Sequence, residues 1–157
     1  MSLLEMCLGL AAAIAIAFTG LVEMSVQGAA EQQQQSAAFF VYGMPRLARA
    51  TQKLLSQSQS VVVYDAQGGS PSASGPVLQA TMNDPASGQT VDTWLCYDAT
   101  KKSLQYINGA GNTWYLGGGE IGALTFTMND DGTVTMFVQS SKGIGYHPGM
   151  EVVLNRQ

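Results

Sequence analysis

The residue types that carry most enzymatic chemistry are sparse in this 157-residue chain and do not cluster along it. His147 is the only histidine, and it lies in a Gly/Pro loop with no nucleophile elbow or cysteine placed beside it. Acid–base and nucleophilic catalysis both need a base within hydrogen-bond reach of the reacting group. We therefore expect His147 to be a loop residue and predict that the chain is not an enzyme.

Aspartate clusters are the next candidate, because carboxylate oxygens are ligands for Ca²⁺. The aspartates in question are Asp84, Asp98, Asp130 and Asp131. The segment Asn129–Gly132 is too short to resemble an EF-hand loop, and Asp and Asn are residues that turns prefer. Gly117–Gly119 precedes a strand pattern instead of a helix, which argues against phosphate binding. We predict turns, with no metal and no cofactor.

The remaining reactive or adhesive groups have ordinary packing interpretations. An adhesive surface is one interpretation of the aromatic residues, but half-buried strand aromatics are more common; these residues are Trp94, Trp114, Tyr115 and Tyr146. Cys7 lies in an apolar run and Cys96 in a strand pattern. A disulfide needs Cα atoms within about 7 Å, so we expect two free thiols that fill apolar space.

Composition and charge exclude a basic nucleic-acid-binding footprint. The net charge is −4, and only 11% of residues are charged while 46% are hydrophobic. The few Lys and Arg residues are scattered between a helical pattern and a turn, so they form no patch of the kind that nucleic acids attract.

The N-terminal segment is the unusual feature of the sequence. Met6–Val22 has no charged residue, and with Leu3 and Leu4 it reaches about 20 residues, which is enough to cross a ~30 Å hydrocarbon core. No basic residue precedes it, and the helical pattern does not stop after it, so it differs from a cleaved secretory signal. We expect a membrane-spanning helix.

The helical pattern continues from Glu23 to about Ser58. Positions three and four apart form a mostly apolar stripe, the mark of an amphipathic helix with one covered face: Val26, Ala30, Gln33, Ala37, Phe40, Met44, Leu47, Thr51 and Leu54. One helix from Met1 to Ser58 is about 85 Å long. A domain of this size cannot enclose it, so lipid or other subunits must cover half of it.

Small residues and a proline modify this long helix. Gly9, Ala13, Ala17 and Gly20 form a ridge that lets helices approach closely in an apolar medium, although an Ala-rich spanning helix has the same look. Pro45 lacks a backbone N–H and clashes with the carbonyl four residues earlier, so we expect a bend there.

Glu5 is an acidic residue within the apolar segment, between Leu4 and the run that begins at Met6. A carboxylate at the centre of a spanning helix costs about 2.5–3.5 kcal/mol, and less near its end. In one interpretation Glu5 lies among lipid headgroups. In the other it pairs with the terminal amine of Met1 on a neighbouring copy, since Met1 and Glu5 are only ~6 Å apart along the axis. That pairing offsets the free-energy cost of burying the carboxylate only when the copies stack in register.

These residues resemble the start of a mature type IV pilin, a family that includes the pseudopilins of type II secretion. The resemblance rests on Met1-Ser2-Leu3-Leu4-Glu5 followed by the apolar run. It implies leader removal by a prepilin peptidase, N-methylation of Met1, and a Glu5 that neutralises the N-terminus of the adjacent subunit. The chain departs from the family at Val22, where a proline is common, and it has one cysteine outside the membrane segment, too few for an intrasubunit disulfide.

The second half of the sequence predicts strands and turns. Alternating polar and apolar residues indicate an antiparallel sheet with one apolar face, and Asn129–Gly132 and Asn108-Gly109 are hairpin signals. The expected strands are Ser60–Asp65, Val77–Met82, Thr90–Tyr97, Ser103–Ile107, Thr113–Leu116, Ala123–Met128, Thr133–Gln139 and Met150–Leu154. A flexible loop is expected at Gln67–Pro76. The fold class is therefore α+β, with the sheet packed on the C-terminal half of the long helix.

The resemblance also implies an organisation and a setting. Residues 1–25 form the transmembrane or filament-core half of the helix, 26–58 its amphipathic half, and 59–157 the β domain. The partners are other copies of the chain in a helical filament, the inner-membrane assembly machinery and, before assembly, the lipid bilayer. The filament is then an extracellular pilus or a periplasmic pseudopilus, serving adhesion, motility, DNA uptake or secretion.

Two alternatives stay open at this point. One is a minor pseudopilin of a type II secretion system. The other is a monomeric, signal-anchored extracytoplasmic binding domain, in which the helix is only a tether and neither Glu5 nor a free Met1 is needed.

Overall fold

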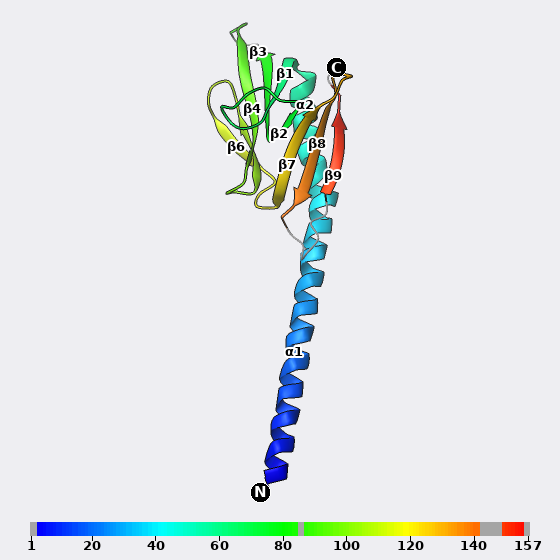
Figure 1. Ribbon diagram of the computed structural model, residues 1–157. Coiled ribbons are helices and arrows are strands. Elements are labelled where there is room, and N and C mark those ends of the chain that lie inside the picture. Colours follow the sequence, from blue (N-terminus) through cyan, green and yellow to red (C-terminus); the bar gives the residue numbers. More distant parts are fainter. Residues whose placement is uncertain (1–2, 85–86, 142–148, 156–157) are drawn as a thin grey trace.

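A long helical rod carries a two-sheet β head at its C-terminal end, and the N-terminus lies at the far end of the rod (Figure 1). This computed structural model describes residues 3–84, 87–141 and 149–155, with side chains from Ile14 onward except that of Ala15. The predicted α+β class, with a long N-terminal helix packed on antiparallel β-structure, is confirmed, but the strands form two sheets where we predicted one.

The rod consists of three consecutive helical elements. They are α1 (Leu3–Ala38), the π-helix η1 (Phe39–Gly43) and α2 (Met44–Ser56). The helix predicted to run to Ser58 thus ends within two residues of the expected position, and β1 follows at once.

We expected a bend at Pro45, and the structure has a π turn just before it. The Met44 N–H donates to the Phe39 carbonyl, an i→i+5 hydrogen bond. Pro45 has no N–H, and its ring excludes a regular α-helical approach to the carbonyl of Val41. A π turn widens the backbone at this point and so accommodates the proline without ending the rod.

The π turn also changes which side of the rod is covered. The head covers the predicted stripe only near its C-terminal end: Val26, Ala30, Gln33 and Ala37 are exposed in the single chain. The residues that the head buries are instead Ser36, Phe39, Met44, Leu47, Thr51, Leu54 and Leu55. The five-residue step from Phe39 to Met44 crosses the π turn, which keeps both side chains on the covered face.

The head is built from two antiparallel sheets. The first has the strand order β1-β3-β4-β5-β6, with bounds β1 (Ser58–Tyr64), β3 (Val77–Asn83), β4 (Thr90–Asp98), β5 (Ser103–Ile107) and β6 (Thr113–Leu116). The second has the order β2-β7-β8-β9, with bounds β2 (Ser74–Gly75), β7 (Ile121–Met128), β8 (Val134–Ser140) and β9 (Gly149–Leu154). All eight predicted strands are present, with ends shifted by two residues at most.

The core lies between the covered face of the rod and the inner faces of both sheets. Leu47 and Leu55 of α2 pack in one cluster with Leu78 and Leu95 of the first sheet and Phe126 of the second. Thr51 is the polar member of the buried stripe, and its hydroxyl donates to the Leu47 carbonyl at 3.0 Å. A hydroxyl with a partner inside its own helix can be buried at little cost.

Strand β2 was not predicted, because its residues belong to the expected Gln67–Pro76 loop. Ser74 pairs with Thr127 and Gly75 with Phe126, while the Ser72 N–H donates to the Val63 carbonyl at 2.8 Å. The loop therefore bridges the two sheets. A Cβ at Gly75 would collide with the Tyr64 carbonyl, so this close backbone approach requires glycine.

Removing the π turn tests its role in setting the covered face. Deletion of the exposed Val41 combined with Pro45→Ala shortens the Phe39–Met44 step to four residues, which a regular α-helix keeps on one face. The free energy of unfolding should stay within about 1 kcal/mol, because a surface change away from the core has small effects. Chemical denaturation followed by tryptophan fluorescence measures it.

Deletion of Ala50, also exposed but within regular helix, is the matched control. It rotates Leu54 and Leu55 by about 100° relative to Leu47 and should unfold the head. Equal damage from both deletions would contradict this role of the π turn.

Candidate assembly surface

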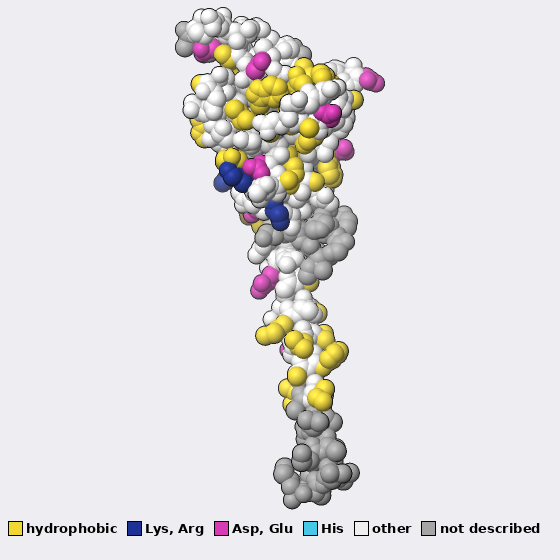
Figure 2. Space-filling view, turned by 60° about the vertical axis from the view of Figure 1, so that its left-hand side comes forward, with side chains coloured by type: hydrophobic (Ala, Val, Ile, Leu, Met, Phe, Trp, Pro, Cys, Tyr) yellow, Lys and Arg dark blue, Asp and Glu magenta, His cyan; other side chains and the backbone are white. Residues whose placement is uncertain are grey.

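The rod protrudes far beyond the head. Among the described side chains of the rod, Ser36 is the first that is buried. The stretch from Leu3 to Gln35 before it is about 50 Å long at 1.5 Å per residue. Figure 2 shows hydrophobic side chains on this protruding part, well separated from the head.

Large apolar side chains on the protruding helix are open to solvent. Their exposed fractions run from 48% at Val22 to 73% at Met24, and the set is Ile14, Ile16, Phe18, Leu21, Val22, Met24 and Val26. At 100° per residue these positions are spread around the whole circumference. Glu23 is the one charged residue in this stretch. A helix with apolar side chains on all its sides requires cover around its circumference, and this chain's described residues provide none.

The hydroxyl groups in this region have hydrogen-bond partners within the helix. The Thr19 hydroxyl donates to the Ile16 carbonyl at 2.9 Å, and the Ser25 hydroxyl donates to the Val22 carbonyl at 2.8 Å. Because a donor with an internal partner can enter an apolar medium at low cost, these residues do not interrupt the apolar surface. Sequence reasoning missed them, since a helical Ser or Thr by itself does not reveal its partner.

Packing within its own chain does not explain why residue 20 is a glycine. A Cβ added there would meet nothing within 4 Å, whereas one at Gly43 would lie 2.6 Å from the Phe39 ring. Glycine in a helix costs up to ~1 kcal/mol relative to alanine. Close approach of another helix is a physical reason to keep it. Ala17 and Gly20 of the predicted small-residue ridge are both exposed.

The other predicted assembly residues lie at the edge of what is described. Met1 is outside the described residues. Glu5, Gly9 and Ala13 belong to α1, but only their backbone is described. Within the described part of the chain, no helix combines the length and the apolarity that a membrane crossing demands.

A buried polar contact fixes the rod to the head. The hydroxyls of Ser36 on the rod and Ser140 on β8 lie 3.0 Å apart in a hydrogen bond. Ser36 is 2% exposed and Ser140 is fully buried. The sequence held no signal for this pair, because its members are 104 residues apart.

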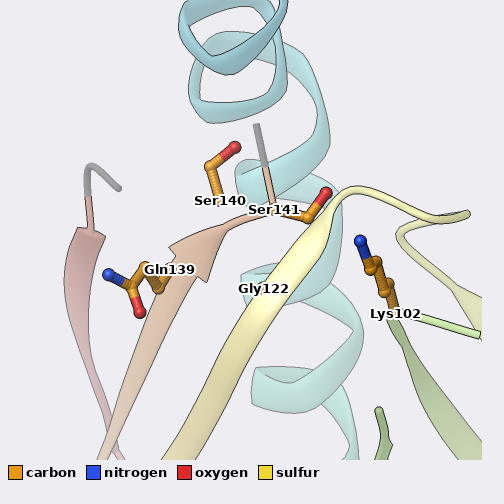
Figure 3. A pocket seen from close by; sticks show the side chains of 5 residues that line it. All are labelled: Lys102, Gly122, Gln139, Ser140 and Ser141. Atoms are coloured by element: carbon orange, nitrogen blue, oxygen red, sulfur yellow. The ribbon is translucent and has the colours of Figure 1, made fainter. Parts of the chain in front are cut away.

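The cleft beside this junction is a structural corner of the head. Figure 3 shows its lining, with Lys102 on one side and Gln139, Ser140 and Ser141 on the other. The Lys102 carbonyl accepts the Ile121 N–H at 3.0 Å, and the Ser141 hydroxyl donates to the Gly119 carbonyl at 2.9 Å. These polar groups hold neighbouring segments of the chain together.

The aspartates considered as cation ligands serve turns. Asp98 Oδ1 accepts the backbone N–H groups of Thr100 and Lys101. Asp131 Oδ1 accepts both the N–H and the hydroxyl of Thr133, and these hydrogen bonds lower the pKa of the Asp131 carboxyl. Asp84 accepts the Ser87 hydroxyl. Among the described residues no three potential metal ligands gather, and His147 lies outside them.

The aromatic residues do not form one surface. Trp94 and Leu95 are consecutive on β4, so they face opposite sides of the sheet. Residues paired across neighbouring strands lie on the same face of the sheet. Leu95 pairs with Tyr106, and Tyr106 pairs with Trp114. Trp114 therefore lies on the face of Leu95, and Trp94 lies on the other face. Trp94 packs on Tyr64 and Trp114 on Tyr106, each with ring centroids 5.5 Å apart. The Lys101 Nζ atom lies 3.6 Å from the centroid of the Tyr115 ring. Tyr146 is outside the described residues.

Cys96 is a buried free thiol, as predicted. Burial raises its pKa to about 11, so it is protonated and unreactive at neutral pH. The side chain of Cys7 lies outside the described part.

Comparison with known proteins adds no relative: no protein family, curated protein or solved structure matches the chain significantly. The geometry of the exposed rod is therefore the feature from which a function must be argued.

Removing the exposed part of the rod tests whether the head folds without it. A chain of residues 31–157 keeps every buried rod residue and should be a soluble monomer with cooperative unfolding, because its apolar stalk is gone. Analytical ultracentrifugation and thermal denaturation measure this.

The control is a chain of residues 48–157, which loses the buried Phe39, Met44 and Leu47 and should not fold. An unfolded or aggregated 31–157 chain would contradict the independence of head and stalk.

Proposed function

We propose that this chain is a structural subunit of a type IV pilus-like filament, in which the apolar parts of α1 from many copies pack together at the centre and the heads face outward. The observation that carries this proposal is the apolar, solvent-exposed circumference of α1 between Ile14 and Val26. A filament centre covers such a helix on all sides.

The free energy available from this cover is large. Full burial of one large apolar side chain stabilises by about 1.5–3 kcal/mol. The seven exposed residues from Ile14 to Val26 therefore supply on the order of 10 kcal/mol per subunit relative to the helix in water. Lipid in the inner membrane supplies the same cover before assembly, so a subunit can be stored there and then transferred into the filament.

Glu5 and Met1 give the filament its register in this proposal. Leader removal by a prepilin peptidase exposes the Met1 amine, which is then methylated and stays positively charged. The Glu5 carboxylate of one copy pairs with that ammonium on the next. An unpaired carboxylate in apolar surroundings is costly, so only the matched stagger is stable.

Gly20 favours assembly over a simple tether. A tether in lipid needs an apolar helix of sufficient length, and alanine would serve it better than glycine. Because nothing of its own chain lies near Gly20, close helix–helix contact between copies accounts for it. A pilus and a pseudopilus share this physical arrangement.

Glu5→Ala tests the proposal most simply. Without the carboxylate the ammonium of the neighbouring copy is left unpaired, so the yield of sheared filaments should fall at least about tenfold, the equivalent of ~1.4 kcal/mol. Mass spectrometry of the N-terminal peptide from wild-type filaments should show a methylated Met1.

Asp130→Ala is the matched control, since it removes an exposed carboxylate from the head and should leave the filament yield unchanged. Normal filament yield from Glu5→Ala, or an uncleaved leader on the chain in cells, would contradict the proposal and favour a monomeric tethered domain.

A further inference from the structure

A groove runs between α2 and β9, which lie side by side at the edge of the head (Figure 1). Its floor is apolar, formed by Ala48 from the helix and Val152 and Leu154 from the strand, and Arg49 and Lys53 lie along its helical side. The rest of the lining is Gln52, Ser56 and Val153.

The end of β9 is tied to α2 beside the groove. The Gln52 Nε2 donates to the Asn155 carbonyl at 2.6 Å, and the Asn155 N–H donates to the Gln52 Oε1 at 3.1 Å. This double hydrogen bond fixes the end of β9 to α2. β9 is the last strand of its sheet, and Val153 is 61% exposed. An exposed edge strand with an apolar side chain is a site where another chain can pack.

The cations of the groove have no ion-pair partner among the described residues. Arg49 and Lys53 are four residues apart on α2, so they lie on one helical face, and both are exposed. Neither forms an ion pair with a residue in the described part of the chain. Two cations along the helical side of the groove fit a helix that carries an acidic residue.

The rod of this same chain has that character. From Ile14 to Ser56 its acidic residues, Glu23 and Glu31, lie only on α1, and its basic residues, Arg46, Arg49 and Lys53, lie only on α2. Glu31 is exposed. It cannot reach the cations of its own rod, because 18 to 22 residues of helix separate them by about 30 Å.

The geometry points to a second copy as the occupant: α1 of a neighbouring subunit lies in the α2–β9 groove, with its Glu31 facing Arg49 and Lys53. This inference rests on the proposed filament. It requires that the neighbour be displaced by about 30 Å along the rod toward the head. A helical assembly gives each subunit several neighbours at different axial offsets, so this contact joins a different pair of copies from the Glu5–Met1 contact.

Charge reversal in the full-length chain tests the contact. Glu31→Lys alone and Lys53→Glu alone each place like charges together and should lower the filament yield about tenfold, the equivalent of 1.4 kcal/mol. The combination of Glu31→Lys with Lys53→Glu restores opposite charges and should return the yield to within about threefold of wild type. Glu31→Lys with Lys101→Glu is the matched control, because Lys101 is a cation in a different part of the head, and should show no rescue.

Cross-linking gives an independent readout. In a Cys7→Ser background, cysteines at positions 31 and 53 should be joined between copies by a short bis-maleimide in assembled filaments, while cysteines at 31 and 101 should not. The buried Cys96 stays unreactive. A β9–β9 cross-link through Val153→Cys in place of the 31–53 product would overturn the inference.

The outcomes separate this inference from the proposed function. If wild-type filaments form and Glu5→Ala blocks them, but both single charge reversals assemble normally or the double reversal shows no rescue, the groove contact is wrong and the filament stands. If wild-type chains form no filaments, both are wrong.

Discussion

The apolar circumference of the protruding α1 helix is the constraint on which the rest of the structure depends. A head of about one hundred residues buries only the C-terminal third of the rod, from Ser36 to Leu55. Between Ile14 and Val26 the helix has large apolar side chains around its circumference and hydroxyls that are satisfied within the helix. Such a surface is favoured among lipids or other helices.

The head contributes a rigid attachment for this rod. The π turn before Pro45 allows one continuous helix to present Phe39 and Met44 to the same core. The Ser36–Ser140 hydrogen bond fixes the point at which the helix leaves the head. A rod held in this way transmits a fixed spacing from the head to the helix tip, which a filament with a regular stagger requires.

Much of this architecture could be predicted from local pattern. The helix limits and the eight strands follow from periodicity and from turn residues such as Asn129–Gly132, because those signals are contained in neighbouring residues. The burial of Ser36, the strand at Ser74–Gly75 and the phase of the covered face could not be predicted. Each depends on a partner far away in the sequence or on a π turn. The assembly role of Glu5 rests on sequence alone, since its side chain lies outside the described part.

The central claim is that other copies cover the exposed part of α1. An environment-sensitive fluorophore on Phe18→Cys, compared with one on Thr100→Cys in the head, measures this cover directly by its emission wavelength and its quenching by iodide. In assembled material the account predicts a blue-shifted, unquenched signal at position 18 and a water-like, quenched signal at position 100. A quenched signal at position 18 in the native assembly, equal to that at position 100, would contradict it.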